Sequence, residues 1–130
     1  MCVVGDEAAS NDGHDSRHVS VWIGVTAPVA YAFIADPRNL AAWAAGLDTS
    51  RVTIEFSPHN AFGVLDHVVR TSAGQAFYNP FRVIPGGGGQ GCCEAVFTVR
   101  RRAGMTDDEF AADVAAVTAD LQVLRRVLES

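Results

Sequence analysis

His67 is the residue of this sequence whose type and position best suit polar chemistry. It lies in the middle of the apolar stretch GVLDHVV, where strand alternation places Leu65 and Val69 on its own face. An imidazole there could orient a ligand carbonyl or move a proton near neutral pH. The alternative is a histidine that is hydrogen-bonded at the edge or surface of a sheet. The preceding Asp66 should point to the opposite face, so the two residues do not form a ready catalytic pair.

Arg82 and Tyr78, in the stretch FYNPFRVIP, are the other catalytic candidates. Arg82 could bind a ligand carboxylate or ketone. Alternation, however, puts Phe81 and Val83 on the apolar face and Arg82 on the other, where a salt bridge to an exposed carboxylate is the alternative. Pro80 can kink this strand and shift the alternation, which affects Tyr78 equally.

The remaining polar residues lack the spacing that metals and covalent chemistry need. The four histidines, at positions 14, 18, 59 and 67, contain no H-E-x-x-H motif, and the three cysteines form no C-x-x-C pair. The chain contains no lysine, which removes P-loop and Schiff-base chemistry, and no G-x-S-x-G motif. Asp113 and Asp120, on one flank of the last helix, should pair with arginines or water. We therefore expect no metal site and no cofactor.

The stretch VIPGGGGQGCC superficially matches the phosphate-binding pattern G-x-G-x-x-G at Gly86, Gly88 and Gly91. A dinucleotide site needs these glycines between a strand and a helix, but here another strand follows. A hairpin turn is the simplest interpretation, because glycine tolerates positive φ. A mobile lip over a pocket is the alternative.

Length and composition indicate one domain. The 130 residues are 48% apolar, contain no run that could span a bilayer, and carry a net charge of −5, which argues against nucleic-acid binding. Residues 1–17 should be an unstructured acidic tail, and residues 18–130 the folded domain. The cysteines are few and odd in number, which favours reduced thiols and a cytoplasmic location. The oligomeric state is open.

Hydrophobic periodicity predicts strands alternating with turns and three helices. The expected strands are 18–26, 51–57, 61–71, 75–84 and 92–101, and the expected short helices are 28–35 and 38–46. Pro37 should end the first short helix, and Gly46 should cap the second in a left-handed conformation. Turns are expected at 57–60 and 72–75.

The last segment is predicted as a long amphipathic helix. Thr106 and Glu109 form a capping box at its start. One stripe along the helix is apolar: Phe110, Val114, Val117, Leu121, Leu124 and Leu128.

The predicted elements are, in order, a strand, two short helices, an antiparallel meander and a long C-terminal helix. Four stretches belong to these elements: APVAYAFIADPRNLAAWAAG, FGVLDHVV, NPFRVIP and GMTDDEFAADVAAVTADLQVLRRVLE. Together, this order and these stretches resemble the SRPBCC superfamily. This group is also called START-like or polyketide cyclase/dehydrase-like. The resemblance runs from about His18 to Glu129 and implies an α+β helix-grip fold, in which a curved antiparallel sheet wraps around the C-terminal helix and leaves an apolar cavity. The five strands counted here are fewer than the six or seven usual in that fold.

The resemblance implies binding of a small hydrophobic molecule, lipid or polyketide-like. An ordinary filled core is the alternative. Inward strand faces, the helix stripe and the second short helix suggest these ligand-binding residues: Trp43, Phe62, His67, Phe81, Phe97, Phe110, Val114 and Leu121, with Val21 and Ile23 also on the wall. One further function is a polyketide cyclase/dehydratase-like enzyme that uses His67 for proton transfer. Another is partner binding through the basic run Arg100, Arg101 and Arg102.

Overall fold

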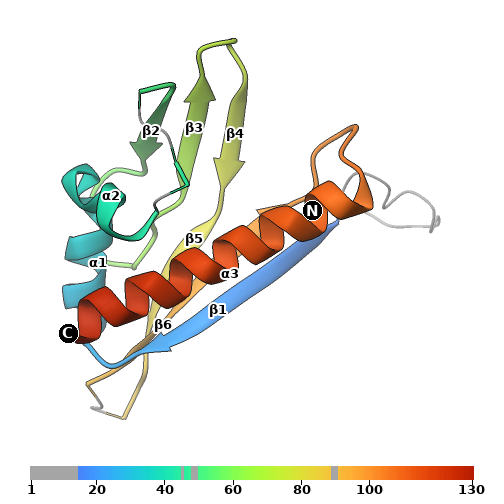
Figure 1. Cartoon of the computed structure of the whole chain (residues 1–130). Helices are drawn as coiled ribbons and strands as arrows, with labels where there is room; N and C mark the ends of the chain where they lie inside the picture. Colours follow the sequence, from blue (N-terminus) through green and yellow to red (C-terminus); the bar gives the residue numbers. More distant parts are fainter. Residues whose placement is uncertain (1–14, 45, 48–49, 89–90) are drawn as a thin grey trace, which may run out of the picture.

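The structure, a computed structural model, describes residues 15–44, 46–47, 50–88 and 91–130. It is an α+β fold of antiparallel sheets and a long C-terminal helix (Figure 1). In chain order the elements are β1 (Ser16–Ile23), α1 (Ala27–Ala35), the 3₁₀ helix η2 (Pro37–Asn39), α2 (Leu40–Trp43), β2 (Val52–Phe56), β3 (His67–Thr71), β4 (Ala76–Asn79), β5 (Phe81–Pro85), β6 (Cys93–Arg100) and α3 (Asp107–Glu129).

The strands form two three-stranded sheets, ordered β1-β6-β5 and β2-β3-β4. Figure 1 shows α3 lying across the β1-β6-β5 sheet, while β2, β3 and β4 extend beyond it on one side. Pro80 separates β4 from β5, because proline cannot donate to a strand ladder. An isolated bridge between Val64, in the loop before β3, and Arg82 of β5 is one of the further links between the two halves. The described residues thus hold six strands where the sequence predicted five.

The alternation predicted for the two long strands is confirmed. In β1, Val21 and Ile23 are buried while Trp22 between them is exposed. They pair with Ala95 and Cys93 of β6, which are also buried. This shared apolar face packs against α1 and α3 and forms the core of the protein.

The predicted capping box of α3 is present. The Thr106 hydroxyl accepts a hydrogen bond from the Glu109 N–H at 3.1 Å, and the Glu109 carboxylate accepts one from the Thr106 N–H at 2.8 Å. At the other end of α3, Glu129 accepts a hydrogen bond from the Gly24 N–H at 2.7 Å. Both ends of the helix are therefore held, and its apolar stripe faces the core through Phe110, Leu121 and Leu124.

Residues 61–66 are not a strand, which corrects the prediction for 61–71. The Asn60 side chain organises this segment instead: its Oδ1 accepts from the N–H groups of Phe62 and Val64, and its Nδ2 donates to the Val64 carbonyl. Asparagine offers the backbone such local partners in place of a ladder. Gly63 then takes a φ of +73°, outside the strand region.

Two helix and turn predictions have different outcomes. The second short helix ends at Trp43, with Ala44 rather than Gly46 as its C-cap, so the predicted left-handed glycine cap is wrong. The glycine-rich stretch does connect the antiparallel neighbours β5 and β6, with Pro85 opposite Cys93, and Gly87 and Gly88 adopt positive φ. The hairpin turn is therefore confirmed.

The N-terminal boundary differs slightly from the expected one. β1 begins at Ser16, so residues 16 and 17 belong to the sheet rather than to a tail. Asp15 is also held against the end of β6, where its carbonyl accepts a hydrogen bond from the Arg101 N–H at 2.9 Å, and residues 1–14 lie outside the described residues. None of the helices that the structure describes has the length and apolar character needed to cross a membrane.

Candidate functional site

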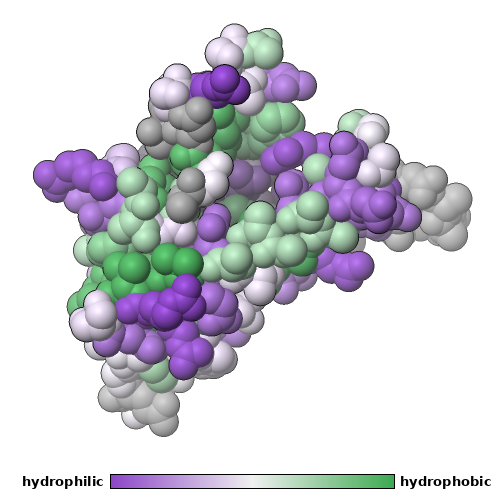
Figure 2. All heavy atoms as spheres, viewed as in Figure 1, coloured by the Kyte–Doolittle hydropathy of each residue, from purple (hydrophilic) through white to green (hydrophobic). Residues whose placement is uncertain are grey.

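A small cavity of about 120 Å³ lies between the β2-β3-β4 sheet, α2 and α3. Figure 2 shows the surface hollowed between that sheet and the middle of α3. Its wall is mostly apolar: Leu40, Trp43, Ala44, Leu47, Ile54, Phe56, Val69, Phe97, Val117 and Leu121, with His67, Asn79 and Asp120 as its polar members.

Strand register brings the polar residues of the sheet together. His67 at the start of β3 lies opposite Phe56 of β2 on one side and Asn79 of β4 on the other. Because cross-strand partners point to the same face, all three side chains line the cavity. Phe97 of β6 contacts His67 with ring centroids 5.7 Å apart and closes the wall at the junction of the two sheets.

The hydrogen bonds of His67 define its neutral tautomer. Nδ1 lies 3.0 Å from the Leu65 carbonyl oxygen, which can only accept, so Nδ1 carries the proton. Nε2 is then the acceptor, and the Asn79 amide nitrogen lies 3.4 Å from it, a long contact. Burial lowers the pKa of His67 below its ordinary value, more than the bond to Leu65 and the charge of Asp66 raise it. The imidazole is therefore neutral near pH 7.

This lowered pKa predicts a pH dependence of stability. Between the folded pKa and the ordinary value of 6.5, the unfolded chain binds a proton at His67 that the folded protein does not. The free energy of unfolding should therefore fall as pH drops below 6.5, by up to about 1.4 kcal/mol per pH unit for this one proton. Urea unfolding from pH 7.5 to 5 should show a shallower slope in His67→Asn than in the wild type. Parallel slopes would contradict the prediction.

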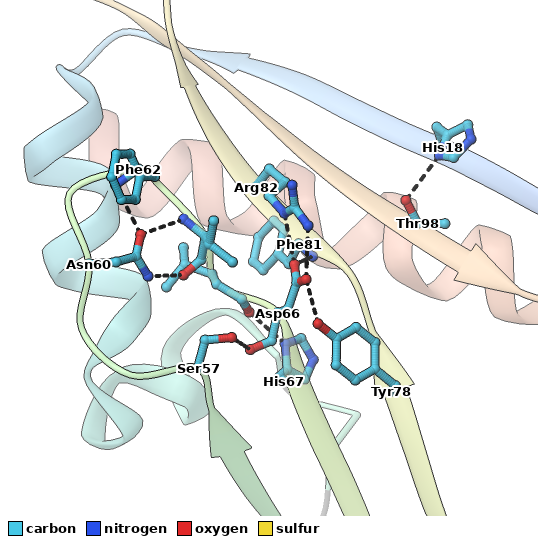
Figure 3. A network of polar contacts seen from close by, with 12 residues as sticks. His18, Ser57, Asn60, Phe62, Asp66, His67, Tyr78, Phe81, Arg82 and Thr98 are labelled. Carbon is cyan, nitrogen blue, oxygen red and sulfur yellow. Dashed lines mark hydrogen bonds and ion pairs between the residues drawn. The ribbon is translucent and has the colours of Figure 1, made fainter. Parts of the chain in front are cut away.

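Asp66 points away from the cavity, as expected from alternation, into a network on the outer side of the sheet. Its carboxylate accepts two bonds from Arg82, both at 2.9 Å, one from the Tyr78 hydroxyl at 2.6 Å and one from the Phe81 N–H at 2.8 Å (Figure 3). Arg82 foremost holds the pKa of Asp66 well below its usual range, and the bond to Asp66 raises the pKa of Tyr78. Asp66 therefore stays ionised, and the phenol of Tyr78 stays protonated.

The catalytic candidates are thus divided between two places. His67 lines the cavity, whereas Arg82 and Tyr78 are bound to Asp66 on the other side of the sheet. The salt-bridge alternative for Arg82 is present, but its partner is a buried carboxylate, 4% exposed, rather than an exposed one. Pro80 does separate the strands, yet Phe81 and Val83 keep the inward face.

The other predicted ligand-binding residues have four different positions, of which the cavity wall is one. Trp43, Phe97 and Leu121 line the cavity. Phe81 is fully buried behind the wall, where its ring contacts those of Trp43, His67 and Phe97. Phe62, at 84% exposed, is on the Asn60 loop and not on an inward strand face, which corrects its predicted placement.

Phe110 and Val114 lie near the start of α3, away from the cavity. They line a separate surface hollow together with Arg17, Arg101 and Asp107. Val21 and Ile23 are members of the packed core. The apolar stripe of α3 therefore faces the cavity only at its middle, through Val117 and Leu121.

The basic run at the end of β6 is engaged within the chain. Arg101 pairs with Asp107 at 2.7 Å, and Arg102 lies 3.8 Å from Asp113 and over the ring of Phe77. The two ion pairs tie the end of β6 to the start of α3, and the contact with Phe77 ties it to β4. They also confirm an arginine partner for Asp113.

Asp120 and Asn79 are the polar cavity residues that were not among the predicted ligand-binding residues, and Asp120 is the charged one. It precedes Leu121 on α3, and within the part of the chain that the structure describes its carboxylate forms no hydrogen bond or ion pair. Burial raises its pKa. Its position on the flank of the apolar stripe was the available signal, but nothing in the sequence distinguished it from Asp113.

Comparisons with known proteins identify the fold. No protein-family model and no curated protein matches the sequence. Among solved structures, the chain is similar to DynU16, a protein of the dynemicin biosynthetic locus, with a TM-score of 0.65, 20% identity, and 89% of this chain aligned to 48% of that one. The Zhui aromatase/cyclase from Streptomyces sp. R1128 matches with a TM-score of 0.51, 16% identity and coverages of 88% and 94%.

Ara h 8.0201 matches with a TM-score of 0.54, 10% identity and coverages of 89% and 98%. This chain therefore spans about half the length of DynU16 and nearly the full length of the other two. At these identities the likeness shows the fold, and it confirms the helix-grip fold expected from the sequence.

Proposed function

We propose that this helix-grip domain binds a small, predominantly apolar molecule in the cavity between the β2-β3-β4 sheet, α2 and α3. The observation that carries the proposal is the cavity itself, whose wall is apolar except for three side chains. Ligand sites combine such apolar walls with a few placed polar groups. The fold shared with the Zhui aromatase/cyclase supports the proposal by analogy.

The test is direct titration with toluene, an apolar probe of one ring, followed by nuclear magnetic resonance. The two tryptophans give two indole N–H signals. Trp43 lines the cavity, whereas Trp22 is exposed on β1. Binding in the cavity should shift the Trp43 signal saturably and leave the Trp22 signal unchanged. An unchanged Trp43 signal at millimolar toluene would contradict the proposal.

Filling the cavity should abolish this binding. Val117 lines the cavity from α3, so Val117→Phe should occupy the space and weaken toluene binding at least tenfold. Cavity filling commonly raises stability by about 0.5–2 kcal/mol, so the variant should remain folded.

The matched control is Val114→Phe. Val114 lies one turn earlier on the same helix stripe but lines the separate surface hollow. This variant should keep wild-type toluene affinity. If both variants lose binding equally, the toluene site is not the cavity described here.

One observation favours a second candidate function, proton-transfer catalysis of the polyketide cyclase/dehydratase kind. His67 is neutral, and its acceptor nitrogen has only the long contact to Asn79. A neutral imidazole at a cavity wall can act as a general base. In an assay of ketone cyclisation or dehydration, His67→Asn should lose turnover while it still binds toluene. Unchanged turnover in His67→Asn would contradict this second function and leave ligand binding as the function.

A further inference from the structure

We infer that the cavity selects a molecule about the size of one ring whose polar group is a hydrogen-bond donor, a hydroxyl or an ammonium, and that the Asp120 carboxylate receives it. This inference rests on the proposed function and specifies its ligand class. It follows from the size of the cavity and from which polar groups on its wall already have partners.

The cavity volume limits the ligand to a small one. An apolar protein cavity of about 150 Å³ holds a benzene molecule. The volume here is about 120 Å³, well below the several hundred that larger ligands occupy. The enclosed part of the ligand is therefore comparable to a single six-membered ring.

Most hydrogen-bond donors on the wall are already engaged or covered. His67 Nδ1–H donates to the Leu65 carbonyl, and the Asn79 amide nitrogen is directed at His67 Nε2. The Nε1–H of Trp43 has no partner in the described structure, but its neighbours cover it completely. For a ligand that only accepts hydrogen bonds, the second N–H of the Asn79 amide, a neutral donor, is what remains among these groups.

Asp120, in contrast, is a hydrogen-bond acceptor without a partner in the described part of the chain. Its carboxylate is half-buried at the edge of an apolar cavity and has no partner among the described residues. A carboxylate withdrawn from water without a donor raises the free energy of the folded protein. The upward shift of its pKa, caused by burial alone, reflects the same imbalance. A ligand hydroxyl or ammonium would supply the missing donor, whereas a ligand carboxylate would add a second negative charge.

The experiment compares five one-ring probes by the Trp43 indole shift: toluene, anisole, phenol, benzylamine and benzoate. Anisole is phenol with its donor methylated, so this pair isolates the donor. We expect phenol, benzylamine or both to bind about tenfold more tightly than anisole, which corresponds to about 1.4 kcal/mol. Benzoate should bind more weakly than toluene.

Variants at two aspartates of α3, Asp120 and Asp113, test whether Asp120 causes the preference for donor probes. Asp120→Leu should reduce about tenfold the affinity ratio of the preferred donor probe, phenol or benzylamine, to anisole. Asp120→Asn should lose most of this ratio while keeping the size of the side chain. Asp113→Leu is the matched control, because Asp113 lies two turns earlier and pairs with Arg102 outside the cavity. It should leave the ratio unchanged.

Each outcome distinguishes the inference from the proposed function. If toluene binds but anisole matches or exceeds both phenol and benzylamine, the inference is overturned and the binding function stands. A donor preference that persists in both Asp120 variants also overturns it. If no probe, toluene included, shifts the Trp43 signal, the proposed function fails and the inference falls with it.

Discussion

Replacing Asp66 with alanine should lower the free energy of unfolding by about 3 kcal/mol, the upper end of what a hydrogen bond to a charged group contributes. Its ion-pair partner Arg82 is half-exposed. The carboxylate is buried and accepts four hydrogen bonds, from Arg82, Tyr78 and Phe81. Asp66 lies in the loop before β3, Tyr78 lies on β4, and Phe81 and Arg82 lie on β5. The Asp66 side chain therefore joins the two sheets at the point where Pro80 separates β4 from β5. Its loss leaves the buried Phe81 N–H without its side-chain acceptor.

Urea or thermal unfolding of Asp66→Ala measures this effect, with Glu55→Ala as the control. Glu55 forms an exposed pair with Arg70 at 3.3 Å, which should contribute only about 0–1 kcal/mol. Comparable small losses in both variants would contradict the role assigned to Asp66.

The stability that Asp66 contributes should also depend on pH in the acid range. The pKa of Asp66 is lowered in the folded protein, so between its folded pKa and its ordinary value of 3.8 the unfolded chain binds the extra proton. The contribution of Asp66 is therefore complete above about pH 4 and is lost as pH falls further. The stability difference between wild type and Asp66→Ala should narrow below pH 4.

Gly63→Ala should be at least as damaging, with an expected loss of about 3 kcal/mol or more. Gly63 has a φ of +73°, which costs a residue with a Cβ about 1–2 kcal/mol. A Cβ at this position would also collide with the carbonyl oxygen of Val83, a backbone atom that cannot rotate away. Because the Gly63 carbonyl accepts a hydrogen bond from the Val83 N–H at 2.9 Å, moving the loop apart would break this link.

Gly74→Ala separates the two contributions. Gly74, in the turn between β3 and β4, has a similar φ of +87° but open space around the position of a Cβ. It should lose only the conformational part, about 1–2 kcal/mol. Equal losses at Gly63 and Gly74 in urea unfolding would show that the contact with Val83 relaxes freely.

Local sequence signals predicted most of the fold, because several elements are specified by their own residues. Two examples are the alternation of Val21 and Ile23 against Trp22 and the capping box of Thr106 and Glu109. In each case the local preference of the sequence agrees with the tertiary structure. The prediction failed where a side chain competes with the backbone. Asn60 converts an apparently alternating segment into a loop, and periodicity alone does not report such hydrogen bonds.

The candidate site was partly predictable. The opposite orientations of His67 and Asp66 follow from strand geometry and were predicted. The position of Phe62 depended on a strand that the Asn60 loop replaces. Asp120 could not be distinguished from Asp113, since both lie on one helix flank. Which of them meets a cavity depends on where along α3 the β2-β3-β4 sheet diverges from the helix, which is a property of the assembled fold.

The division into two sheets bears on how a molecule could enter the cavity. α3 packs along β1 and β6, whereas the cavity separates the middle of α3 from β2, β3 and β4. The two halves are linked at Pro80, through the Val64–Arg82 bridge and the Asp66 network, and at the end of β6, where Arg100 and Arg102 lie over the rings of Tyr78 and Phe77. Proteins open in cooperative units at a lower cost than complete unfolding. Opening of the β2-β3-β4 half as one such unit would require these links to break, and it would admit a ligand while the β1-β6-β5 half and α3 stay intact.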